Sequence, residues 1–435
     1  MKNQIITLAA CMLLSTAVFG QNENKINELR LNLNTDGSHF VKATFANQTW
    51  VRITDTNPGS TLDGYDVKNL FDIGLRRTRF QLFGKVHDRV FFYTQIGQNN
   101  LSFNTPRKAG LFVHDAVGEI EIAKDVVSVG AGLAAWSGLS RFASASIANQ
   151  LGFDAPLYQQ ATNDVTDQFL RKYSVYAKGK IRKLDYRLAI SKPMTVKNST
   201  VQDISISDNS KFAPTPPKPQ FQGYFMLQLK DQESNQTPYN SGTYLGKKDV
   251  LTIGTGFITQ KGAMWHQEGP QTRFEDLKLW SADVFYEHPL NKAQGNAVTV
   301  YAAYSITDFG KNYVRNLGVM NPANGVSTTA SFNGAGNAFP MIGTGSTLFA
   351  QAGYLFNKDL LGKMGTLQPY ADIQYSKFDL LKDPMALYEA GLNWLIDGQR
   401  AKVSLAYQSR PVYGSSTHTV NDRKGMAVAQ VQVSI

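Results

Sequence analysis

The sequence predicts an all-β protein: a transmembrane antiparallel β-barrel of about sixteen strands, with short periplasmic turns at one end and long extracellular loops at the other. Three observations support this prediction. Apolar and polar residues alternate along stretches of about 9 to 13 residues, the length of a tilted membrane strand. Beyond residue 20, no stretch reaches the roughly 18 unbroken apolar residues of a membrane-spanning helix. The polar face also carries too many charged and amide side chains for the dry core of a soluble sandwich.

The chain begins with a segment that is typical of a secretory signal peptide. Lys2 gives it a positive charge, residues 5–19 form an apolar run, and a small residue follows. We therefore expect residues 1–20 to be removed on export. Residues 21–38 would then form a short N-terminal periplasmic segment, and residues 39–435 the barrel.

Cys11 is the only cysteine of the chain and lies inside this leader. Leu8-Ala9-Ala10-Cys11 matches a lipoprotein cleavage pattern, but the apolar run continues beyond Cys11, so we favour a signal peptide over lipidation. The exported chain then has no cysteine, which excludes disulfides, thiolate metal sites and a cysteine nucleophile.

Positive charge exceeds negative charge, with 44 Lys and Arg residues against 34 Asp and Glu residues and a net charge of +10. The basic residues are spread along the chain, so we do not expect nucleic acid as a partner. Three interpretations remain open: solvated loops, a lumen that attracts anions, or contact with the anionic headgroups of membrane lipid and lipopolysaccharide.

The alternation is clearest in residues 297–307. Val300 and Tyr304 share one face, which suits lipid, and Thr299 and Ser305 share the other, which suits water. About sixteen segments of this kind predict a closed barrel wide enough for an aqueous channel. Their centres lie near residues 46, 76, 93, 117, 130, 173, 187, 225, 254, 282, 302, 350, 372, 391, 405 and 430.

The inward face is strongly polar near the C-terminus, which suits a water-filled lumen. The inward polar residues there are Asp372, Gln374, Glu389, Asn393, Lys402 and Gln408. Three tryptophans, Trp50, Trp136 and Trp280, fall near predicted strand ends, where we expect them in the aromatic girdles at the two membrane interfaces.

The connections between the predicted strands differ in length. Brief turns alternate with long polar stretches, of which residues 136–168, 193–218 and 308–344 are the longest. Short periplasmic turns and long extracellular loops are the usual arrangement in such barrels. Residues 231–248 break this rule, because they should form a periplasmic turn yet are numerous and polar. The sequence alone gives no physical reason for their number.

The alternation fails in the strand that holds Arg76, Arg77 and Arg79. If Phe80 faces lipid, Arg77 and Arg79 face the lumen. Arg76 then points outward, where a cation near the membrane midplane costs about 2 to 4 kcal/mol. A local bulge, a position near the headgroups, or pairing with a neighbouring strand would remove the conflict.

The arginine strand continues into a turn with Gly84 and a returning aromatic strand that includes Phe91-Phe92-Tyr93. Over residues 70–97 this pattern resembles the early strands of the phosphate-selective porin O and P family. The resemblance implies a homotrimeric, sixteen-stranded porin of the bacterial outer membrane. It also implies that the third long loop folds into the lumen as a constriction that carries basic residues.

In this chain the loop that the resemblance places in the constriction is residues 136–168, which carry one cation, Arg141. Phosphate-selective members of the family carry a denser ladder of basic residues, so we expect at most a mild anion preference. The candidate pore-lining and constriction residues are Arg77, Arg79, Ser140, Arg141, Lys172 and Arg187.

These observations favour passive diffusion of small hydrophilic or anionic solutes over catalysis. The six histidines show no metal-ligand spacing, and no Gly-x-Ser-x-Gly elbow or phosphate loop is present, so we expect no enzyme activity, metal or cofactor. One alternative is a plugged barrel whose extracellular loops, notably residues 308–344, bind a partner or ligand. A less favoured alternative is a barrel enzyme with Ser, His and an acidic residue at one rim.

Overall fold

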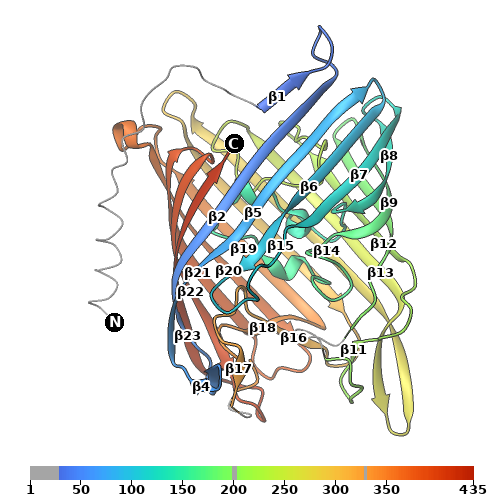
Figure 1. Ribbon diagram of the computed structural model, residues 1–435, viewed down its shortest axis with the longest axis vertical. Helices are drawn as coiled ribbons and strands as arrows, with labels where there is room; N and C mark the ends of the chain where they lie inside the picture. Colours follow the sequence, from blue (N-terminus) through green and yellow to red (C-terminus); the bar gives the residue numbers. More distant parts are fainter. Residues whose placement is uncertain (1–28, 198–202, 328–330) are drawn as a thin grey trace.

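The computed structural model describes residues 29–197, 203–327 and 331–435. It shows a closed antiparallel barrel whose tilted strands surround a lumen that other segments of the chain enter (Figure 1). The predicted all-β barrel is confirmed. The signal peptide expected at residues 1–20 lies outside the described residues, as do residues 21–28.

Sixteen strands form the barrel wall, and each pairs antiparallel with the next along the chain. The last strand returns to the first, where Phe45 and Ile435 exchange backbone hydrogen bonds of 3.1 and 2.8 Å. Every predicted strand centre falls inside one of these strands. The wall strands are β2 (Phe40–Asp55), β5 (Asn69–His87), β6 (Val90–Leu101), β7 (Phe112–Ala123), β8 (Val127–Ala134), β9 (Lys172–Ile181), β10 (Leu184–Lys192), β12 (Gln220–Gln228), β13 (Val250–Glu268), β14 (Gln271–Asn291), β15 (Asn296–Asp308), β19 (Gly345–Leu355), β20 (Thr366–Phe378), β21 (Met385–Asp397), β22 (Ala401–Tyr413) and β23 (Val420–Ser434).

The smaller elements precede the wall or lie in its connections. Among the described residues, no helix is long and apolar enough to cross a membrane. The smaller elements are β1 (Leu29–Asn32), β3 (Ser60–Leu62), β4 (Tyr65–Asp66), η2 (Arg141–Ser144), η3 (Ile147–Asn149), η4 (Leu157–Gln159), β11 (Lys211–Phe212), β16 (Val314–Leu317), β17 (Gly325–Val326), β18 (Phe339–Gly343) and η5 (Gly362–Met364).

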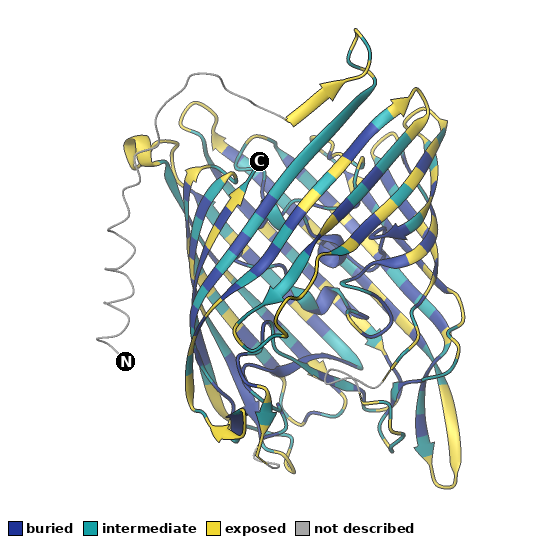
Figure 2. Cartoon of the chain, viewed as in Figure 1, coloured by how far each residue is buried: buried dark blue, intermediate teal, exposed yellow. Residues whose placement is uncertain are grey.

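Buried and exposed residues alternate along the wall strands (Figure 2). In β15, Val300 and Tyr304 are 40% and 45% exposed, whereas Thr299 and Ser305 are each 1% exposed. The strands therefore present an apolar outer face and a polar inner face, as the alternation predicts.

The tryptophans do not all lie where the sequence places them. Trp280 is 43% exposed on the outer face, but Trp50 and Trp136 point into the lumen and are 1% and 4% exposed. The interfacial prediction is wrong for these two. Trp50 lies on the inward face of β2, where its indole N–H donates to Gln430 at 2.6 Å. Trp136 belongs to a connection that turns inward directly after β8.

A β-bulge resolves the arginine conflict on β5. Gln48 lies opposite Arg77 and the next residue, Thr49, lies opposite Leu75, so Arg76 is the extra residue. Arg76 and Arg77 are both buried inside the barrel. The bulge therefore turns two successive arginines inward, and neither faces lipid.

The two ends of the barrel differ. At the turn end, where β2 begins and β23 ends, the connections have two to ten residues, apart from residues 229–249. At the loop end, several connections are longer, and β13 and β14 project beyond the barrel as a hairpin with its turn at residues 269–270 (Figure 1, lower right). That the turn end faces the periplasm remains a prediction.

Candidate functional site: the occupied lumen

Three connections fold into the lumen. We call residues 135–171 the crossing segment, residues 309–344 the loop-end segment and residues 229–249 the turn-end segment. Inward side chains of the wall hydrogen-bond to their backbone; Gln374 on β20, for example, donates to Met341 O of the loop-end segment at 3.1 Å. The predicted polar lumen is present, but the chain itself fills much of it.

The crossing segment starts at β8, returns to β9 and reaches the opposite wall. There, Gln48 on β2 donates to Ile147 O at 3.0 Å, and Lys402 on β22 donates to Gln150 O at 3.0 Å. Asn393 on β21 donates to a further carbonyl of the segment at 2.7 Å. Amide and ammonium donors on the wall thus satisfy backbone carbonyls that a segment buried in the lumen would otherwise leave unpaired.

The turn-end segment meets the crossing segment inside the barrel. The Asn240 N–H donates to Ser144 O at 2.8 Å, and Asn240 O accepts a hydrogen bond from the Ser146 N–H at 2.9 Å. A short turn could not reach this position. The contact gives a structural reason for the length of the connection, which the sequence alone does not explain.

Arg141 is fully buried at the junction of the two segments. Its guanidinium forms a bidentate ion pair with Glu233, with one hydrogen bond of 2.9 Å, and lies 3.7 Å from the ring centroid of Phe285. Burial alone would raise the pKa of Glu233, but the charge of Arg141 and hydrogen bonds from Arg141, Tyr244 and Thr252 lower this pKa to about 2. A paired, ionised carboxylate therefore joins the crossing and turn-end segments.

A cavity of about 170 Å³, which we call the arginine cavity, lies between β5 and the crossing segment. Asp154 accepts hydrogen bonds from two of its arginines, and Asp115 pairs with Arg171 at 3.3 Å. In the part of the chain that the structure describes, Arg79 has no carboxylate partner and donates to two backbone oxygens and Asn99. The basic residues that line the cavity are Arg76, Arg77, Arg79 and Arg171.

A larger cavity, of about 610 Å³, lies at the turn end against the β5–β9 wall. Between it and the arginine cavity, a space of about 10 Å³ is lined by aromatic rings that include Tyr93, Trp136 and Tyr176. The three spaces lie along the inner face of one wall, and the space at these rings is the smallest of them. The charged residues that line the turn-end cavity are Lys85, Arg89, Glu119, Glu121, Asp125, Lys178, Lys180 and Arg182.

Of the six predicted site residues, two line the arginine cavity and four hold the inward segments. Ser140 donates to Gln159 at 2.7 Å and Lys172 donates to Thr162 at 2.9 Å, both within or beside the crossing segment. Arg187 donates to a backbone carbonyl of the turn-end segment at 2.8 Å. Arg141 is the member of the ion pair described above. All four side chains are buried.

The carboxylates that balance lumenal arginines could not be picked out from the sequence, among them Asp115, Asp154 and Glu233. The unusual length of the turn-end connection is the one signal that pointed toward Glu233. Asp154 lies in a long loop, where a carboxylate is ordinarily solvated, so nothing in its neighbourhood distinguishes it. Asp115 lies on β7, whereas its partner Arg171 lies at the end of the crossing segment, so no local pattern connects the two residues.

Within the described residues, no group of three or more His, Cys, Asp or Glu residues is placed to hold a metal ion. Ser210, His266 and Glu275 meet at the loop end, but the hydroxyl and the imidazole both bond to the Glu275 carboxylate, at 2.5 and 3.0 Å. A serine nucleophile needs its hydroxyl on the imidazole, and these three residues do not provide that contact.

No family model matches the chain, and no curated protein matches it. Solved structures do. One is Salmonella typhi OmpF in complex with daunomycin, with 10% identity over 92% of this chain and 99% of that chain and a TM-score of 0.50. Another is the high-pH structure of Pseudomonas putida OprB, with 10% identity over 91% of this chain and 94% of that chain and a TM-score of 0.53. At this identity the likeness shows the fold, which is that of bacterial outer-membrane porins.

Proposed function

We propose that this protein is a bacterial outer-membrane porin through which small hydrophilic solutes diffuse passively along the inner face of β5–β9. The observation that carries the proposal is the row of three spaces on this wall, from the turn-end cavity to the arginine cavity. A sixteen-stranded barrel is wide enough for a channel, and its apolar outer face suits a membrane. The rings of Tyr93, Trp136 and Tyr176 are the proposed narrowest point.

Positive charge along this wall supports a mild preference for anions. Arg77 and Arg79 are the proposed pore-lining residues, and Ser140, Arg141 and Lys172 shape the passage by holding the crossing segment. The arginine cluster agrees with the resemblance to the phosphate-selective family. Most of these arginines, however, have carboxylate partners, so we propose a general anion preference without phosphate selectivity.

The reversal potential of the refolded protein in a planar bilayer, under a salt gradient, tests this proposal. Arg79→Gln is expected to lower the anion-to-cation permeability ratio, because it removes the arginine-cavity charge that no carboxylate balances. Arg273→Gln is the matched control, because Arg273 lies on the exposed β13–β14 hairpin. An open channel with an unchanged ratio in Arg79→Gln would contradict the anion preference, and the absence of conductance would contradict the diffusion route.

A plugged barrel is the second candidate function, with loops at the loop end that bind a partner or ligand. The observation that favours it is the extent to which the crossing, turn-end and loop-end segments fill the lumen. The same bilayer measurement separates the two candidates, since a plugged barrel would fold without conducting ions.

The surroundings of the barrel are part of the proposal. We propose export through a cleaved signal peptide, insertion among outer-membrane lipid and lipopolysaccharide, and a homotrimer. The resemblance of residues 70–97 to the phosphate-selective porin family supports the trimer. Native mass measurement of the detergent-solubilised protein tests it, with a single-chain mass as the contradicting result.

A further inference from the structure

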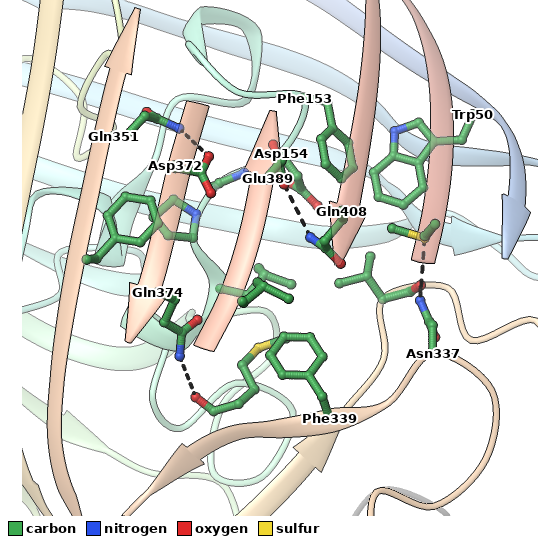
Figure 3. Close-up of a pocket in the computed structure, with 18 residues that line it drawn as sticks. Trp50, Phe153, Asp154, Asn337, Phe339, Gln351, Asp372, Gln374, Glu389 and Gln408 are labelled. Carbon is green, nitrogen blue, oxygen red and sulfur yellow. Dashed lines mark hydrogen bonds between the residues drawn. The ribbon is translucent and has the colours of Figure 1, made fainter. Parts of the chain in front are cut away.

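A cavity of about 60 Å³ lies on the opposite side of the lumen, against β19–β22 (Figure 3). We call it the acceptor cavity. Asp372 and Glu389 face each other across β20 and β21, with Cβ atoms about 4.5–5.5 Å apart at such directly paired positions. The cavity lining contains no Lys, Arg or His. Within the described residues, no ion pair includes either carboxyl group.

Amide side chains of the lining hydrogen-bond to both carboxyl groups of this cavity. Gln351 donates its amide nitrogen to Asp372 at 3.0 Å, and Gln408 donates to Glu389 at 3.2 Å (Figure 3). Asn337, which is 5% exposed, has no partner for its Oδ1 among the described residues. Each side-chain amide nitrogen carries two N–H groups, and Gln351 and Gln408 each use one of theirs on a carboxyl group, so the lining offers donors as well as acceptors. None of these groups is cationic, so a cationic occupant would supply the counter-charge that the two carboxyl groups lack.

The rest of the lining is largely apolar. Trp50, Phe153 and Phe349 are buried aromatic residues of this lining, and Leu387 and Met341 add aliphatic surface. A bare metal ion would leave this surface without a contact. An ammonium group on a short hydrocarbon chain would contact both the carboxyl groups and the apolar lining of the cavity. Its N–H groups donate to carboxylates, and its charge is attracted to the faces of aromatic rings.

The size of the cavity limits the ligand. One water needs roughly 10–15 Å³ of such space, so about 60 Å³ admits a ligand of roughly five heavy atoms. We propose that the acceptor cavity binds a small organic ammonium ion, with its charged group on Asp372 and Glu389 and its hydrocarbon chain against Phe349 and Leu387. The site goes beyond the proposed diffusion along β5–β9 and does not depend on conductance.

Isothermal titration of the refolded protein in detergent tests the site with n-butylammonium chloride, which has the required size, and with n-butanol, which has similar size and no charge. The wild-type protein is expected to bind n-butylammonium at least about tenfold more tightly than n-butanol, since charge-assisted hydrogen bonds are the stronger ones. This comparison needs no variant. Equal affinities for the two compounds would overturn the proposal.

The paired substitution Asp372→Asn with Glu389→Gln keeps the size of both side chains and removes their charge. It is expected to weaken n-butylammonium binding at least about tenfold. The matched control is Asp422→Asn with Glu268→Gln, because these side chains are 51% and 58% exposed on the surface. Unchanged affinity in the lumenal double variant, or binding of Ca²⁺ without binding of n-butylammonium, would overturn the assignment.

Discussion

Substitution of Glu233 by Gln removes the carboxylate that balances Arg141 where the crossing and turn-end segments meet. The two side chains are 5% and 0% exposed. Leaving one partner of a buried ion pair uncompensated costs about 3–5 kcal/mol. The pKa of Glu233, lowered from its usual 4.5 to about 2, corresponds to about 3 kcal/mol for the same contacts. We therefore expect the junction to lose about 3 kcal/mol of local stability.

Hydrogen–deuterium exchange measures this loss at the junction itself. The amides of Asn240 and Gly242 bond to carbonyls of the crossing segment at 2.8 and 2.7 Å. If local opening becomes easier by about 3 kcal/mol, their exchange should accelerate roughly a hundredfold in Glu233→Gln. Glu268→Gln is the matched control: its pair with Arg273 is exposed, and surface pairs contribute about 0–1 kcal/mol.

Unchanged exchange at Asn240 and Gly242 in Glu233→Gln would show that the ion pair does not stabilise the junction. A double-mutant cycle with Arg141→Met gives a second check. If the ion pair holds the junction, the double variant should lose less stability than the two single variants together, because the buried charge and its partner leave at the same time. Strict additivity would show that the two side chains act independently.

Three further predictions concern pH, backbone packing and the narrow point of the lumen. Since the pKa of Glu233 is lowered, the stability that its carboxylate gives to the junction is present above about pH 4.5 and is lost as the pH falls through about 2. Hydrogen exchange at the junction should therefore rise over this pH range in the wild type but not in Glu233→Gln. Gly179→Ala should lower the denaturation midpoint, because the new Cβ would lie 1.8 Å from a backbone carbonyl oxygen. Gly118→Ala, whose new Cβ has no atom within 4 Å, should leave the midpoint unchanged. Equal midpoints in the two variants would contradict the predicted clash. Trp136→Ala should raise single-channel conductance and the outward-facing Trp280→Ala should leave it unchanged; no rise in Trp136→Ala would place the narrow point elsewhere.

The wall of the barrel can be predicted from the sequence because lipid and lumen impose opposite demands on successive residues. In β15 this produces a period-two pattern that is visible without any long-range information. The bulge at Arg76 is one of the three solutions that the sequence allows for three arginines in four residues. The structure selects it because Asp154, from the crossing segment, provides a lumenal partner for Arg76 and Arg77.

The contents of the lumen could not be predicted in the same way. Arg141 and Glu233 lie 92 positions apart and meet only because two connections enter the barrel from opposite ends. No local pattern marks either residue as a partner of the other. The position of Trp50 was equally hard to predict, because a tryptophan near a strand end fits an interfacial girdle as well as the lumen. It packs inside the barrel against Phe153 of the crossing segment, with ring centroids 5.1 Å apart.

Single-channel conductance of the refolded wild-type protein in a planar bilayer measures the proposed diffusion along β5–β9 itself. We expect stepwise openings of low conductance, and a reversal potential under a salt gradient that shows a preference for anions. A correctly folded barrel that inserts but never conducts would contradict the diffusion route along β5–β9.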